Sequence, residues 1–98
     1  MTINIEKTNE KVQLILEGRL DTTTAPELEK VISELPAETT LLVLDMNQLA
    51  YISSAGLRVI LGAQKKMNKV GAMKVCGVCE EVMEVFDITG FSDILDIE

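Results

Sequence analysis

Residues 41–44, Leu-Leu-Val-Leu, most constrain the fold of this chain because they are four consecutive aliphatic residues. A strand without a polar face is typical of the middle of a sheet, beside parallel neighbours that helices cover. After this run the chain crosses a short polar connection to Ser53 and Ser54, which lie directly ahead of an apolar-periodic segment. The stretch therefore predicts a buried strand over residues 41–46, a loop, and a helix with hydroxyl groups in its first turn.

Two alternating segments near the N-terminus predict a hairpin. Apolar side chains recur at every second position in residues 2–7 and 11–18, and Asn9 with Glu10 supplies a tight turn between them. Because such segments present one apolar and one polar face, we expect the first two strands to pair with one face half solvated.

A helix is expected to follow this hairpin. Thr24 and Glu27 have the spacing of a capping box, and Pro26 suits the first helical turn. Apolar residues from Ala25 to Leu35 recur at helical spacing, and a proline directly after them ends the predicted helix.

The rest of the chain alternates helices and strands. The segment after Ser53 has a helical apolar stripe, and residues 72–78, 80–89 and 94–97 predict a strand, a helix and a last short strand. The full order is β-β-α-β-α-β-α-β, which predicts an α/β fold around a mixed sheet of about five strands. No linker or repeat divides the sequence, so we expect a single domain over residues 1–98.

Composition narrows the functional classes. The chain has 98 residues and a formal net charge of −7, which argues against nucleic acid and anionic membranes and favours a partner that offers Lys and Arg. It has no histidine, which removes histidine-based nucleophilic pairs and most zinc sites. We therefore expect no enzyme activity, no metal and no cofactor. No membrane-spanning run or signal peptide is visible, so a complete, cytoplasmic protein is expected.

Cys76 and Cys79 have the C-x-x-C spacing of thiol oxidoreductases and lie near a predicted strand-to-helix junction. In such enzymes the first cysteine caps the helix, whereas Cys76 belongs to the predicted strand and only Cys79 reaches the helix start. We therefore interpret both as small buried residues in a strand, with a thiol redox function as the alternative.

The loop Ser53–Leu57 is the remaining candidate site. A helix N-terminus has backbone N–H groups without partners and a partial positive charge, so a serine there either caps the helix or holds a phosphate. Ser54, Ala55 and Gly56 are small, which leaves the backbone of the first turn open to another molecule. The loop follows an inner strand and so lies at the carboxyl edge of the sheet, where α/β domains place their sites.

A second loop joins this candidate site if the second and third strands run parallel. Asp21, Thr22 and Thr23 also follow a strand and precede a helix. Parallel strands would bring this loop beside Ser54, so Asp21 either pairs with a basic residue of a partner or caps its own helix.

Four segments carry a family resemblance: Gly18–Asp21, Leu42–Asp45, Leu49–Leu57 and Val85–Phe91. Together, in this order and spacing, they are similar to the STAS domains of bacterial anti-sigma factor antagonists, and the resemblance covers essentially the whole chain. It implies a mixed sheet with interspersed helices, in agreement with the periodicity.

The resemblance also implies a regulatory protein without catalysis of its own. Members bind an anti-sigma factor with serine kinase activity and so free the sigma factor; phosphorylation of a serine breaks the complex, and a serine phosphatase restores it. Carried onto this chain, that serine is Ser54, and Ser53, which replaces the family's usual aspartate, is the second choice. The implied partner-binding surface is Asp21, Thr22, Thr23, Ser53, Ser54, Ala55, Gly56 and Leu57. A STAS regulatory module of another signalling or transport system is the alternative.

Overall fold

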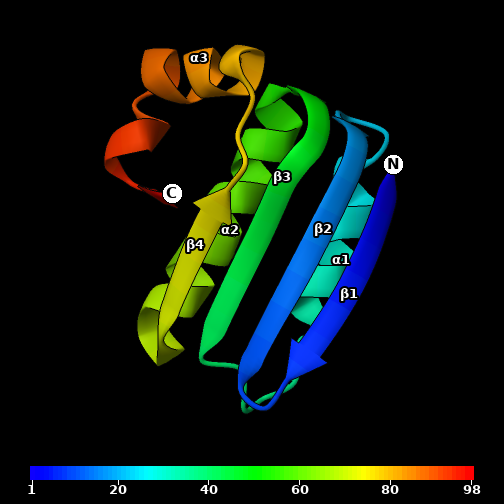
Figure 1. Cartoon of the computed structure of the whole chain (residues 1–98), viewed down its shortest axis with the longest axis vertical. Helices are drawn as coiled ribbons and strands as arrows, with labels where there is room; N and C mark the ends of the chain where they lie inside the picture. The colour runs from blue at the N-terminus through cyan, green and yellow to red at the C-terminus, as the bar shows by residue number, and fades with distance from the viewer.

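In the computed structural model, which describes residues 1–98, the aliphatic run 41–44 lies in the central strand of a five-stranded mixed sheet (Figure 1). The elements in chain order are β1 (Thr2–Thr8), β2 (Lys11–Leu20), α1 (Ala25–Ser33), β3 (Leu41–Ile52), α2 (Ser54–Val70), β4 (Ala72–Cys76), α3 (Glu80–Thr89), the short 3-10 helix η1 (Phe91–Asp93) and β5 (Asp96–Ile97). The sheet order is β1-β2-β3-β4-β5. Only β1 and β2 pair antiparallel; the other neighbours are parallel. The predicted α/β fold and its order of elements are confirmed.

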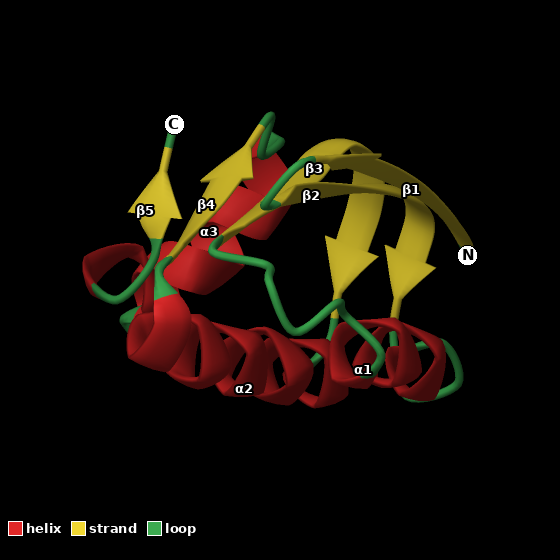
Figure 2. Cartoon of the chain, turned by 90° about the horizontal axis from the view of Figure 1, so that it is seen from below, coloured by secondary structure: helices red, strands yellow, loops and turns green.

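Helices α1 and α2 lie against one face of the sheet, and Figure 2 shows the two helices beneath the strands. Alternate residues of the inner strands fill this side with fully buried side chains, because successive strand residues point to opposite faces; they include Leu14, Leu16, Leu42, Leu44, Met46 and Val75. On the other face Val43 is also buried, at 8% exposure, although its neighbours across the strands are the polar residues Gln13 and Lys74. The expectation that helices cover this part of β3 holds for one face only.

Strands β2 and β3 are longer than predicted. β3 continues to Ile52 instead of ending at Met46, and β2 continues to Leu20. The polar residues Asn47 and Gln48 interrupt the apolar run and suggested a loop, yet Gln48 pairs with β2 across a register shift. Pairing then continues until Leu20 meets Ile52, so both strands end side by side at the same edge of the sheet.

The ends of the later elements also differ slightly from prediction. β4 ends at Cys76 because Gly77 has a left-handed backbone (φ 69°) and turns the chain away from the sheet. α3 covers residues 80–89 as predicted and stops at Gly90, which is left-handed (φ 82°). The last strand is only Asp96–Ile97, because residues 91–93 form a 3-10 turn.

Gly56 brings the first turn of α2 into close contact with the ends of β2 and β3. A Cβ atom at this position would lie 2.7 Å from Cγ of Leu20 and 3.0 Å from Cγ1 of Ile52, closer than side chains tolerate. Both neighbours are buried and fully packed, so they have little room to move. The absence of a side chain at Gly56 therefore determines where α2 begins relative to the sheet.

Replacing Gly56 with alanine should lower the free energy of unfolding by about 1 kcal/mol. Overpacking a core costs about 1–3 kcal/mol, and the higher helix propensity of alanine offsets about 1 kcal/mol of this loss. Gly62→Ala is the matched control on the same helix, since a Cβ there has no atom within 4 Å, and it should raise stability by about 0.5–1 kcal/mol. Urea unfolding followed by circular dichroism measures both variants. Equal stabilisation by both would show that α2 does not need a glycine at position 56.

Candidate functional site

The loops that follow β2 and β3 lie side by side, as expected for parallel strands (Figure 1). Leu20 and Ile52 are register partners, and the N–H of Ser53 donates to the carbonyl oxygen of Leu20 at 2.9 Å. Asp21 therefore begins one loop and Ser53 the other at the same edge of the sheet. This arrangement joins the two predicted parts of the site.

Ser53 and Ser54 have different roles at the start of α2. Ser53 is the N-cap: its Oγ accepts from the N–H of Gly56 at 3.5 Å, and its carbonyl oxygen accepts from the N–H of Leu57 at 2.9 Å. Ser54 is the first residue of the helix, is exposed, and makes no side-chain hydrogen bond within the chain. The capping function thus belongs to Ser53, and the hydroxyl group of Ser54 is free.

Asp21 organises the neighbouring loop through its carboxylate. Its Oδ1 accepts from the N–H of Thr23 at 3.0 Å, from the hydroxyl of Thr23 at 2.7 Å and from the N–H of Thr24 at 3.2 Å. The hydroxyl of Thr23, followed by the two backbone N–H groups, lowers the pKa of Asp21 below its ordinary value, against the opposing effect of desolvation.

The capping box predicted from Thr24 and Glu27 is absent. The Thr24 hydroxyl donates instead to the carbonyl oxygen of Arg19 at 2.7 Å and accepts from the N–H of Asp21 at 2.9 Å. With these two bonds made, the Thr24 hydroxyl does not bond the first turn of α1. The N–H of Thr24, which would donate to Glu27 in a capping box, donates to the Asp21 carboxylate instead. The Asp21 carboxylate thus holds the turn that precedes α1 and bonds no N–H group of the helix itself, which begins at Ala25.

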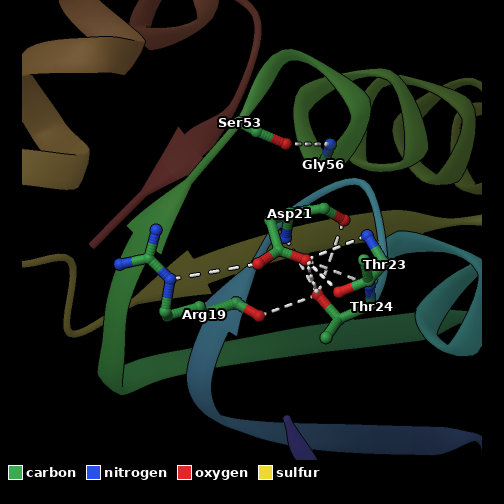
Figure 3. A network of polar contacts seen from close by, with 6 residues as sticks. All are labelled: Arg19, Asp21, Thr23, Thr24, Ser53 and Gly56. Atoms are coloured by element: carbon green, nitrogen blue, oxygen red, sulfur yellow. Dashed lines mark hydrogen bonds and ion pairs between the residues drawn. The ribbon is translucent and has the colours of Figure 1, made fainter.

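Arg19 and Tyr51 extend this cluster across the two strands. The Nε of Arg19 lies 3.9 Å from Oδ2 of Asp21, and its Cζ lies 4.1 Å from the ring centroid of Tyr51, its register partner. Figure 3 shows Arg19 on one side of the Asp21 carboxylate and Thr23 and Thr24 on the other. No local pattern in the sequence predicts this stacking, since it depends on the register of β2 and β3.

The residues of the predicted partner surface differ in their exposure to solvent. Thr22, Thr23 and Ser54 are exposed, and Ala55 is half-buried. Two residues of the predicted surface face inward: Gly56 is buried, and Leu57 is only 8% exposed. Gly56 and Leu57 therefore pack against the core and are not accessible to a partner. A shallow hollow between α1 and α2 begins at Ala55, the residue after Ser54, and is lined by Thr22, Ala25, Pro26, Glu29, Ala55, Arg58 and Val59.

Cys76 and Cys79 are both half-buried rather than buried, and only Cys76 lies in a strand, so the prediction of two buried strand residues is not met. Cys76 is in β4, and Cys79 precedes α3 with its Sγ 3.5 Å from the carbonyl oxygen of Leu49. Both are free. Burial raises the pKa of Cys76, and the carboxylates of Asp45 and Glu98 raise it further. A redox thiol needs a lowered pKa, so this environment argues against the redox alternative.

The net negative charge of the chain comes from its C-terminal part. Residues 1–79 contain nine acidic and nine basic residues, whereas residues 80–98 contain seven acidic residues and no basic one. The acidic excess therefore lies on α3, η1 and β5, and the part of the chain that carries both candidate loops is balanced in charge. None of the helices is both long and apolar enough to cross a bilayer.

Comparison with known proteins identifies the family. A family model described as the STAS domain matches residues 2–98. The chain belongs to the STAS domain family. The anti-sigma-B factor antagonist of Bacillus subtilis is 34% identical to this STAS protein, over 99% of the chain and 92% of the relative. The anti-sigma-B factor antagonist of Staphylococcus aureus is 29% identical, over 99% of the chain and 94% of the relative.

Solved structures of STAS proteins have the same fold. The unphosphorylated form of the anti-sigma factor antagonist SpoIIAA superimposes with a TM-score of 0.82 at 20% identity, covering 99% of this chain and 88% of that one. An anti-sigma factor antagonist from Mycobacterium paratuberculosis gives a TM-score of 0.88 at 23% identity, covering 98% and 83%. At these identities the likeness concerns the fold, and it confirms the predicted STAS-like sheet.

Asp21→Ala should destabilise the STAS domain near neutral pH, and this loss should shrink as the pH falls. Because hydrogen bonds lower the pKa of Asp21 from its ordinary value of 3.8, its contribution is present above pH 3.8 and is lost as the pH falls through the lower folded-state pKa. Thermal unfolding of wild type and variant at pH 7 and between pH 4 and 2 measures the difference. Thr22→Ala, an exposed change in the same loop, is the control and should show no such trend. A difference that stays constant down to pH 2 would rule out this role for the carboxylate.

Proposed function

We propose that this STAS protein is an anti-sigma factor antagonist that acts as a switch without catalysis of its own. In this proposal it binds an anti-sigma factor with serine kinase activity, and phosphorylation of Ser54 breaks the complex until a serine phosphatase removes the phosphate. The observation that carries the proposal is the exposed, unbonded hydroxyl of Ser54 at the start of α2. Support also comes from relatives, named anti-sigma-B factor antagonists, that match the chain over nearly its full length.

Accessibility favours Ser54 over Ser53 as the modified residue. A kinase must reach the hydroxyl group and place it in line with the phosphate of ATP. The Ser54 side chain is exposed, whereas Ser53 is half-buried and its Oγ faces the N–H of Gly56.

The proposed partner surface consists of the exposed parts of the two loops. Thr22, Thr23, Ser54 and Ala55 offer small side chains that a partner can approach closely. Asp21 contributes mainly by holding Thr23 and Thr24 in place. Ser53, Gly56 and Leu57 also belong to the surface expected from the sequence. They contribute indirectly, by holding Ser54 in position.

A phosphate on Ser54 would act by charge and size at this surface. It adds about 1.5 to 2 negative charges, and the surrounding part of the chain is balanced in charge, with nine acidic and nine basic residues in residues 1–79. A partner surface fitted to a neutral hydroxyl would have to desolvate the new charge, which is costly. The helix N-terminus accommodates an anion, so the fold itself need not change.

The test uses candidate serine kinases of the anti-sigma factor class from the organism that encodes this chain. Incubation with ATP should add one phosphate, located on Ser54 by mass spectrometry; Ser53→Ala should still be modified and Ser54→Ala should not. In calorimetry without ATP, Ser54→Asp should bind at least about thirtyfold more weakly than wild type, because desolvating an added charge in an interface costs about 2 kcal/mol or more.

The control for added charge is Ser33→Asp, which places the same carboxylate at an exposed position at the far end of α1. It should bind the kinase as wild type does. The switch would be refuted if no candidate kinase modified the wild type while Ser54→Asp kept full affinity, since the protein would then be a constitutive binding module. Phosphate found on Ser53 would move the acceptor by one residue.

A further inference from the structure

We propose that Arg58 holds the phosphate of phosphorylated Ser54, so that modification removes a free cation from the surface as well as adding an anion. The proposal rests on the proposed function for the identity of the modified serine. It concerns the regulation of the same site, namely which side chain of the domain binds the phosphate after Ser54 is modified.

Helix geometry places the two residues together. Ser54 is the first residue of the 17-residue helix α2, and Arg58 follows four positions later on the same helix. Residues at this spacing lie one above the other on the helix surface, with Cβ atoms about 5–6 Å apart. Long side chains on a helix lean toward its N-terminus. This geometry allows the side chain of Arg58 to reach back over the turn that carries Ser54.

Arg58 is available for this contact. Its side chain is exposed and takes part in none of the ion pairs or side-chain hydrogen bonds of the structure. It lines the hollow between α1 and α2 with Thr22, Ala55 and Glu29, and it is the only basic residue there. Glu29, the only acidic residue of that lining, forms no ion pair with it.

Arg19, the other arginine of the chain, is occupied elsewhere. It pairs with Asp21 and stacks on Tyr51. Its neighbours in the strands, Leu20 and Ile52, point into the core under α2. Because successive strand residues point to opposite faces, Arg19 and Tyr51 lie on the face away from α2. Arg58 is therefore the cation that a phosphate on Ser54 meets first.

The chemistry of the pair is favourable. A guanidinium group donates two parallel N–H bonds to phosphate oxygens, and these charge-assisted bonds are short and strong. The first N–H groups of a helix have no intrahelical acceptors and face the same anion. Together they would satisfy the phosphate within the domain, leave the fold in place, and withdraw Arg58 from the surface offered to the partner.

The test measures the second pKa of the phosphate by phosphorus NMR on protein synthesised with phosphoserine at position 54, so that no kinase or partner is needed. A nearby cation stabilises the dianion and lowers this pKa, so Arg58→Gln should raise it by about 0.2–0.4 unit at low ionic strength. Glu29 and Asp21, the carboxylates nearest the hollow and the loop, are unchanged in every variant, so they add the same background to each titration.

Two controls remove the same charge at other positions. Lys65→Gln alters an exposed lysine further along α2, and Arg19→Gln removes the other arginine near the loops. Both should shift the phosphate pKa by less than half as much as Arg58→Gln. Equal shifts for Arg58→Gln and Lys65→Gln, or a larger shift for Arg19→Gln, would overturn the proposal. Because the titration contains neither partner nor kinase, its result is independent of whether the protein binds an anti-sigma factor.

Discussion

The parallel pairing of β2 with β3 up to their last residues is the constraint on which the site depends. The hydrogen bond from Ser53 to Leu20 closes this pairing at 2.9 Å, and both following loops start from it. Gly56 then lets α2 sit directly on the two strand ends. Since each loop is tied to a buried strand, the position of Ser54 relative to Asp21 is set by the core rather than by the loops themselves.

This arrangement separates the residues that build the loop from the residues that can meet another molecule. Ser53 caps the helix, Gly56 and Leu57 pack inward, and Asp21 holds the threonines after it. Ser54 alone among the loop's polar groups near the helix start is exposed and unbonded. A modification there changes the charge of the surface and leaves the supporting contacts in place, which is what a reversible switch requires.

Much of the fold follows from local patterns in the sequence. The aliphatic run 41–44 predicted the central strand because a strand without a polar face must lie between neighbours, and the helical stripe after Ser53 predicted the start of α2 to the residue. Cys76 and Cys79 were placed correctly at the end of β4 and before α3.

What the sequence did not predict depends on contacts between distant segments. The second half of β3 looked like a loop because Asn47 and Gln48 are polar, and only pairing with β2 makes it a strand. Thr24 has the spacing of a cap, but the carbonyl of Arg19 takes its hydroxyl. The small size of Gly56 predicted a backbone open to another molecule. In the structure Gly56 is buried against Leu20 and Ile52, a contact between distant segments that the local sequence does not indicate.

The central claim is that phosphate on Ser54 acts at the surface and leaves the fold unchanged. Amide NMR spectra of the protein with serine and with phosphoserine at position 54 test it most directly. The account predicts shifts confined to residues 20–29 and 52–59, which form the two loops and line the hollow between α1 and α2. Large shifts throughout β4 and α3, or loss of slow hydrogen exchange in the sheet, would show that the phosphate rearranges the domain and would contradict the account.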